Sequence, residues 1–203
     1  MKRFNVIIVS LVSILFLTSM ALGQITGTAH DFEGATWNTS GEICIVCHTP
    51  HNADVTVADA PLWNHEMSTA TYALYSGFTI DATIVQPSGS AKLCLSCHDG
   101  TVALDNFGGA TGGTDFVTTG NLGTSLSDDH PISFNYDAAL VTADGELAAT
   151  SATSGLGSTI ENDMLFGGQM QCASCHDVHG NGIAKFLVKT NAGSALCLTC
   201  HIK

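Results

Sequence analysis

The longest apolar stretch of the chain spans residues 4–17 and directly follows two basic residues, Lys2 and Arg3. The small residues of the sequence ALG come shortly after it. A basic start, a short apolar run and a small-residue exit predict a secretory signal peptide over residues 1–23, because the run is shorter than the roughly 20 residues of a membrane-spanning helix. No later stretch is apolar enough to cross a bilayer. We therefore expect residues 24–203 to be exported by the Sec route, without membrane insertion.

Beyond this run the pattern predicts little regular structure. Gly, Ser, Thr, Ala and Asp are abundant and aromatic residues make up 7% of the chain, so a conventional apolar core is not expected. The segment 64–76 predicts a helix of about twelve residues, begun by Asn64 as its N-cap. Short strands are expected around the sequences DFVTT and PISFNY. The expected fold class is a mostly irregular, coil-rich chain with short helices and few short strands.

The charge balance excludes nucleic acid as a partner. Against 18 Asp and Glu, the basic residues left after removal of residues 1–23 are Lys92, Lys185, Lys189 and Lys203. Neutralising phosphates requires Lys and Arg, so neither a nucleic acid nor an anionic lipid surface fits this chain. Scattered acidic residues are typical of a protein kept soluble outside the cell.

The cysteines carry the strongest pattern in the sequence. All eight fall in four C-x-x-C pairs, and a histidine directly follows each pair, in CIVCH, CLSCH, CASCH and CLTCH. C-x-x-C-H is the attachment signature of c-type haem. A disulfide framework would not need these histidines, a zinc site would combine two pairs around one ion, and a thioredoxin-like motif uses a single pair. We therefore expect four covalently bound c-type haems.

The spacing of each motif matches the chemistry of haem attachment. The two cysteine sulfurs form thioethers to the two vinyl groups of one porphyrin, and the next residue projects under the iron as its proximal ligand. The predicted thioether residues are Cys44, Cys47, Cys94, Cys97, Cys172, Cys175, Cys197 and Cys200. The predicted proximal ligands are His48, His98, His176 and His201. Four large apolar porphyrins would also supply the core that the side chains lack.

Five further histidines are candidates for the four distal positions on the irons. They are His30, His51, His65, His130 and His179. Methionine is the rival ligand, but only three methionines lie outside the predicted signal peptide. Imidazole binds haem iron well, so we expect four of the five histidines to be distal ligands, with one of the five spare or acting on a neighbouring chain.

The surroundings of these histidines differ. His51 and His179 each follow a proximal histidine by three residues, where a side chain cannot easily reach the far face of its own haem. We expect each to bind the other haem of its own pair. His130 precedes a proline and therefore lies on an extended segment, not a helix. His30 lies seven residues from the predicted cleavage point, so we expect it on a mobile arm.

The four motifs form two pairs. The first member of each pair carries the extra histidine, in ICIVCHTPHN and QCASCHDVHGN, and the second follows a GSA sequence, in GSAKLCLSCH and GSALCLTCH. This pattern indicates a duplicated two-haem unit, near residues 44–98 and 172–201, within one tetrahaem domain over 24–203. The connection, 101–170, is rich in Gly, Thr, Ser and Asp. A disordered linker is one interpretation; we favour an ordered segment that delivers His130 to an iron.

A series of short sequences extends the pattern along the chain. HDF, CxxCHTPHNA, APLWNH, LCLSCHDGTVA, DDHPIS, CxSCHDVHG and ALCLTCH follow one another in this order. In this the chain closely resembles the extracellular tetrahaem cytochromes that form filaments, or nanowires, typified by outer-membrane cytochrome E of metal-reducing bacteria. The likeness covers nearly all of residues 24–203. It implies two histidine ligands on every iron, haems alternating between stacked and T-shaped contacts, and one axial ligand from an adjacent subunit, for which His30 is the first choice.

The function that follows is electron conduction by a bis-histidine tetrahaem cytochrome. Its expected partners are identical subunits in an extracellular filament, donor cytochromes of the periplasm or outer membrane, and a mineral or electrode as acceptor. The alternative is a monomeric periplasmic electron shuttle. An enzyme, such as a multihaem nitrite or sulfite reductase, is not expected, because it needs an open iron position and a cationic pocket, and no arginine lies outside the predicted signal peptide.

Overall fold

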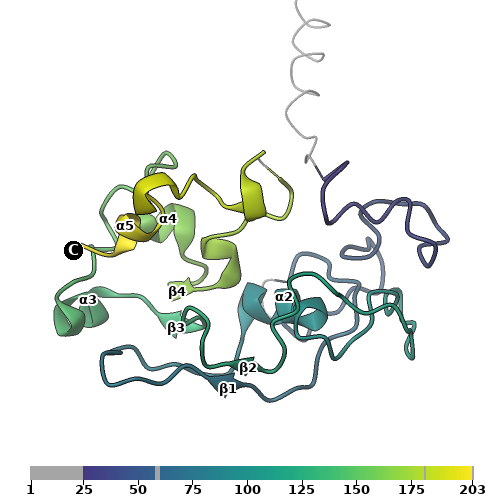
Figure 1. Cartoon of the computed structure of the whole chain (residues 1–203), viewed down its shortest axis with the longest axis horizontal. Coiled ribbons are helices and arrows are strands. Elements are labelled where there is room, and N and C mark those ends of the chain that lie inside the picture. Colours follow the sequence, from purple (N-terminus) through teal and green to yellow (C-terminus); the bar gives the residue numbers. More distant parts are fainter. Residues whose placement is uncertain (1–24, 58–59, 181, 203) are drawn as a thin grey trace, which may run out of the picture.

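The computed structural model describes residues 25–57, 60–180 and 182–202, so the predicted signal peptide lies outside the described residues. Most of the described chain is irregular, with short helices and two-residue strands scattered along it (Figure 1). The expectation of a mostly irregular fold with few short elements is therefore confirmed. No helix in this part of the chain is long and apolar enough to cross a membrane.

Helices are short and several of them carry cysteines. The longest helix among the described residues, α2, spans Gly89–His98 and contains the whole second C-x-x-C-H motif. The other α-helices are α3 (Ala138–Asp144), α4 (Ile160–Met164) and α5 (Cys197–Cys200). Single 3-10 turns form η2 (Cys172–Ser174), η3 (Ala184–Phe186) and η4 (Ala192–Ser194). The third and fourth motifs thus begin in η2 and α5, whereas the first forms only a turn over residues 45–47.

Two small sheets connect distant segments. Strand β1 (Ala73–Leu74) pairs in parallel with β2 (Ser125–Leu126). Strand β3 (Phe134–Asn135) pairs in antiparallel fashion with β4 (Gln169–Met170). Strand β3 lies inside the sequence PISFNY, so this predicted strand is confirmed.

The apolar core is divided into three clusters. Two of them hold only three buried residues each, around Trp63 and around Tyr72. The largest lies in the C-terminal half and consists of Phe134, Tyr136, Leu140, Ile160, Met164, Leu165, Met170, Leu196 and Cys200. A chain with so little contiguous apolar packing needs further apolar mass to hold its segments together, as its composition predicts.

Gln171 joins the two halves of the chain. Its side chain is 2% exposed and lies between α2 and η2. Its Oε1 accepts hydrogen bonds from the backbone N–H of Ala91 at 3.2 Å and from the Ser133 hydroxyl at 3.4 Å. Its Nε2 donates to Gln169 at 3.0 Å. These bonds hold the second and third motifs against each other.

The predicted helix over 64–76 is wrong. The Asn64 side chain does not cap a helix but donates a hydrogen bond to the Ile45 carbonyl. The backbone N–H groups that a helix would use within itself bond to distant partners: Glu66 N–H to Asn106 O at 2.8 Å, and Ala73 N–H to Thr124 O at 3.0 Å. Tertiary pairing has therefore overridden the local capping signal, which is a weak preference by comparison.

The predicted strand around DFVTT is wrong as well. Residues 115–119 form no strand, although they include Val and Thr, which favour strands. Asp115 contributes one backbone hydrogen bond, from Leu104 N–H to its carbonyl at 2.7 Å. A strand needs a partner strand along its length, and this segment has only that single backbone–backbone hydrogen bond.

Candidate functional site

Each C-x-x-C-H motif is closed by the same hydrogen bond. The backbone N–H of the histidine donates to the carbonyl of the first cysteine, at 2.9 Å in His48, 3.0 Å in His176 and 3.0 Å in His201. The second motif lies inside α2, where this is the ordinary helical bond. One helical turn therefore carries two sulfurs and an imidazole on neighbouring positions in all four motifs.

A distant segment holds each motif in place through its backbone. Around the first motif, Asn64 N–H donates to Cys47 O at 3.0 Å and Thr49 N–H donates to Leu62 O at 2.9 Å. Around the third, Val188 N–H donates to Cys175 O at 2.9 Å and Asp177 N–H donates to Phe186 O at 2.7 Å.

The second and fourth motifs are held in a similar way. At the fourth motif, Ala148 N–H donates to Cys200 O at 2.8 Å and Ile202 N–H donates to Glu146 O at 2.8 Å. The second motif has a single bond of this kind, from Leu122 N–H to His98 O at 2.7 Å. We call the four holding segments, residues 61–64, 120–122, 185–188 and 146–148, the clamps.

Three clamps also orient the imidazole of the motif they hold. The ring Nδ1 of His48 lies 2.6 Å from the carbonyl of Pro61, that of His98 2.7 Å from Gly120, and that of His176 2.8 Å from Lys185. An Nδ1–H that donates to a carbonyl leaves Nε2 with its lone pair free, which is the tautomer that binds a metal. His201 has no such partner for its ring within the described residues.

The clamps contain residues in the left-handed backbone region. Gly120 has φ +77°, and the non-glycine residues Leu62, Lys185 and Phe186 have φ of +55°, +62° and +56°. Such values are costly for residues with a Cβ, and they cluster at functional sites. Sequence reasoning missed the clamps, and Gly120 is the single residue whose type gave a signal for this conformation.

Three proximal histidines face a distal candidate across a constant distance. The ring centroids are 5.9 Å apart for His30 and His98, 6.2 Å for His48 and His179, and 6.3 Å for His130 and His201. Two imidazoles bound to opposite faces of one iron, each through a metal–nitrogen bond of about 2 Å, would have centroids roughly 6 Å apart. The residues therefore fit c-type haem with two histidine ligands at these three places.

His30 is not on a free arm. Its ring packs against Phe186 at 4.8 Å between centroids and lies beside His98 of the same chain. Burial, with smaller contributions from the charges of His98 and His179, lowers the pKa of His30, which favours the neutral ligand form. Its Nδ1 is buried without a hydrogen-bond partner in the described chain. The expected mobile arm is corrected by this packing.

His179 reaches a different motif from the one expected. Its ring plane is nearly parallel to that of His48, at 12°, and it thus lies across from the first motif instead of the fourth. The reason is that the segment following the third motif folds back toward the N-terminal half, where Phe186 also meets His30. The expectation that His179 serves the other haem of its own pair is corrected accordingly.

The three histidines outside these pairs differ in exposure. His65 is 2% exposed, and its Nδ1 and Nε2 lie 2.9 Å and 3.0 Å from the carbonyls of Glu66 and Ala103. Burial lowers the pKa of His65, partly offset by these carbonyls. His51 and His176 are both exposed, and neither ring packs against another aromatic ring in the described part of the chain.

The thiols follow one another through the molecule in motif order. Cys47 lies close enough to Cys94 to interact electrostatically, Cys94 contacts Cys172, and Cys175 interacts with Cys197. None of the eight cysteines forms a disulfide with another. Burial, with a smaller contribution from neighbouring thiols, raises the pKa of Cys47 to about 11. For the same main reason the pKa of Cys97 rises to about 12 and that of Cys200 to about 11.

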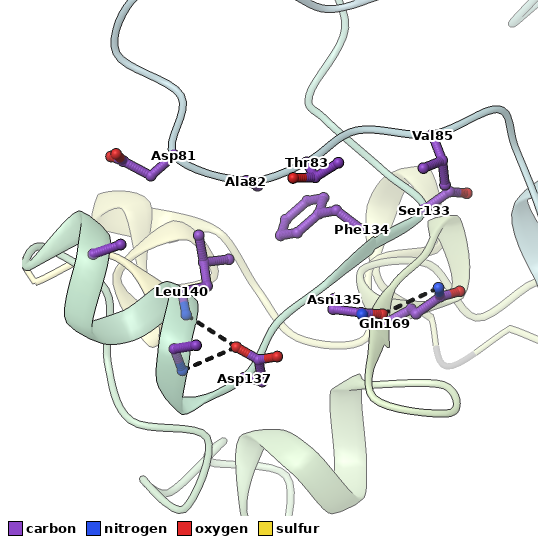
Figure 2. Close-up of a pocket in the computed structure, with 12 residues that line it drawn as sticks. Asp81, Ala82, Thr83, Val85, Ser133, Phe134, Asn135, Asp137, Leu140 and Gln169 are labelled. Atoms are coloured by element: carbon purple, nitrogen blue, oxygen red, sulfur yellow. Dashed lines mark hydrogen bonds between the residues drawn. The ribbon is translucent and has the colours of Figure 1, made fainter.

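A pocket elsewhere on the surface contains none of these residues. It lies between the segment 81–85 and the elements β3 and α3 (Figure 2). The Asp137 carboxylate at its edge caps α3, accepting hydrogen bonds from the N–H groups of Ala139 and Leu140 at 3.0 and 2.9 Å. No cysteine or histidine lines it. Likewise, no group of three or more His, Cys, Asp or Glu side chains in the described ranges is placed to hold a single metal ion, as a zinc site would require.

Comparison with known proteins supports the haem interpretation for the C-terminal pair of motifs. Residues 166–203 match a protein family model described as a doubled CXXCH motif. This range contains the third and fourth motifs. None of the curated proteins matches the chain.

The doubled CXXCH motif indicates a multihaem c-type cytochrome that binds haem covalently and takes part in electron transfer. This class is consistent with the role of an electron carrier rather than that of an enzyme. The motif turns and the clamps at all four positions, and the histidine pairs at three of them, are consistent with this class.

Proposed function

We propose that the chain carries four covalent haems, each held by two histidines, and conducts electrons along them. The observation that carries this proposal is the repeated centroid distance of 5.9 to 6.3 Å between a proximal histidine and a distal candidate. Three of the four proximal histidines thus have a second imidazole at the span of an iron with two axial ligands. Bound haem supplies one-electron chemistry, Fe(III) to Fe(II) and back.

The order of the motifs in space supports a relay. Each motif neighbours the next through its cysteines, from the first to the fourth, with the Cys94–Cys172 contact joining the two halves. Electrons entering at one end of the chain would therefore pass through all four sites in turn. With two histidines on each iron, no position is open to a substrate, which argues against a reductase.

We propose further that the protein is secreted and polymerises into an extracellular filament, with one iron ligand supplied by a neighbouring chain. After the three histidine pairs are assigned, His176 has no distal partner. His51 is exposed and His65 is buried between two carbonyls. We therefore choose His51 as the ligand given to the His176 iron of the next subunit, in place of His30, whose ring lies beside His98 of its own chain.

The partners then follow from the same proposal. Identical subunits extend the relay, a donor cytochrome of the periplasm or outer membrane supplies electrons, and a mineral or electrode accepts them. A monomeric periplasmic shuttle is the alternative, in which all ligands come from one chain.

Electron microscopy of material sheared from expressing cells, with haem-stained gels to identify this chain, separates the two. Thin, unbranched fibres of this cytochrome are expected, and discrete haem protein of one chain's mass would contradict polymerisation. The ligand choice is tested with His51→Ala against a matched His30→Ala variant. The first should abolish fibres while three haems keep two histidines, whereas the second should spoil one haem within each chain. Intact fibres in His51→Ala with four six-coordinate haems would exclude His51.

A further inference from the structure

A buried carboxylate directly follows the proximal histidine of the second motif. Asp99 is 3% exposed and lies next to His98 at the end of α2. Its Oδ1 accepts hydrogen bonds from the backbone N–H and the hydroxyl of Thr101, at 2.7 and 2.8 Å. Its Oδ2 accepts from the Tyr72 hydroxyl at 2.6 Å and from the Ser68 hydroxyl. Four donors surround one side chain.

These donors stabilise the ionised form of the carboxylate. An ionised carboxylate only accepts hydrogen bonds, and the N–H of Thr101 can only donate. Burial of a charge is costly unless the charge is fully hydrogen-bonded, and Asp99 meets that condition. The result is a fixed negative charge inside the fold, close enough to Cys97 to interact with it electrostatically.

A cation lies beside the fourth motif. The Lys189 ammonium donates to the Thr199 hydroxyl at 3.0 Å and to the Ser154 carbonyl at 2.7 Å. Thr199 is one of the two residues between the cysteines of that motif. The charge of Lys189 reaches Cys200, one of those cysteines.

We propose that Asp99 lowers the midpoint potential of the haem held by His98 and that Lys189 raises that of the haem held by His201. The physical reason is that ferric haem carries one more positive charge than ferrous haem. A nearby anion therefore stabilises the oxidised form, and a nearby cation the reduced form. Asp99 is buried, so solvent screens its charge little, whereas Lys189 is half-buried and its effect is screened more. The two side chains thus separate the potentials of two haems that share otherwise similar ligands.

This inference rests on the proposed haems at the second and fourth motifs, so haem content is measured first on the wild-type holoprotein. Fewer than four haems per chain would overturn the proposed function, and the inference with it. With four haems present, an optical redox titration with mediators follows the one-electron steps of wild type, Asp99→Asn, Lys189→Gln and the double variant.

Asp99→Asn should raise one of the four steps. At a fixed potential the ratio of reduced to oxidised haem for that step should rise about tenfold, which is about 59 mV, because a neighbouring unit charge shifts an equilibrium by at least this factor. Lys189→Gln should lower a different step. The double variant should show both shifts together.

Two controls separate charge from structure. Asp137→Asn removes the same charge away from the motifs and keeps a good helix cap, so all four steps should stay in place. Tyr72→Phe removes one hydrogen bond to Asp99 but keeps its charge, so it should not raise any step. The proposal is overturned if Asp99→Asn and Lys189→Gln leave the four steps unchanged, or if Tyr72→Phe raises the same step as Asp99→Asn. If Asp99→Asn does not fold, the Lys189→Gln shift decides the matter.

Discussion

Replacing Gly120 by alanine tests whether a clamp positions its histidine. Gly120 has φ +77°, and its carbonyl accepts the hydrogen bond from His98 Nδ1 at 2.7 Å. A Cβ added there would lie 3.4 Å from His98 Nδ1 and 3.5 Å from its Cε1. Gly123, in the same loop, has φ +68° and would meet nothing within 4 Å. Gly123→Ala is therefore a control with the same backbone strain but without the contact.

The strain term is the same for both variants. A residue with a Cβ in the left-handed region costs about 1–2 kcal/mol. For a chain of this size each kcal/mol lowers the melting temperature by about 2–4 °C, so both variants should melt roughly 2–8 °C lower. The added Cβ of Gly120→Ala sits at van der Waals contact with the ring, so no further large penalty is expected. Relief of the backbone strain at residue 120 should instead shift its own carbonyl and lengthen the Nδ1–H···O bond to His98.

That second effect distinguishes the two variants. A hydrogen bond from Nδ1–H makes the imidazole a stronger electron donor to its metal, so weakening the bond should raise the midpoint potential of the haem at His98. We expect this rise, together with a changed low-spin electron paramagnetic resonance signal, in Gly120→Ala only. If both variants melt lower but have the same spectra and potentials, Gly120 does not orient His98 and the clamp account is refuted.

Three further predictions concern the rest of the fold. Gln171→Ala should lower the free energy of unfolding by about 1–3 kcal/mol, because it leaves the buried N–H of Ala91 without an acceptor, and denaturant titration measures the change. Tyr136→Phe should lower the free energy of unfolding by about 1 kcal/mol in the same titration, because the Tyr136 hydroxyl donates to the clamp carbonyl of Ala148 at 2.7 Å. The control is Tyr75→Phe, which should cost less because the Tyr75 hydroxyl has no hydrogen-bond partner in the described chain. Equal losses in the two variants would contradict the role of the clamp. Burial, and next the hydrogen bond to Asp99, raise the pKa of Tyr72 to about 12 from 10.0 when unfolded, so its stabilising contribution is complete below pH 10 and is lost as the pH rises to 12; the melting temperature of the wild type should fall more steeply over that interval than that of Tyr72→Phe.

The sequence predicted the chemistry of the motifs better than the way they are held. C-x-x-C-H requires one helical turn, and that turn forms in all four places because it needs only residues next to one another. The low content of regular structure could likewise be predicted, because it follows from the composition of the chain and not from which distant segments pair. The helix expected at Asn64 failed because the amide of that residue bonds to Ile45, a partner that no local pattern identifies.

The distal histidines show the same limit. Counting identified five candidates, and the structure brings three of them to a proximal ring. Which distal histidine lies opposite which proximal histidine depends on how the halves of the chain pack. That packing rests on contacts such as the hydrogen bond between Gln171 and Ala91. The left-handed conformations of Leu62 and Lys185 were equally hidden, because neither residue type favours them.

The central claim, four haems with two histidines each, is tested most directly on the purified holoprotein by intact mass combined with electron paramagnetic resonance. The account predicts a mass increase of four haems, no free thiol, and only low-spin ferric signals in the assembled protein. A smaller increase with thiols still reactive, or a stoichiometric high-spin signal from an iron with an open position in the assembled state, would contradict it.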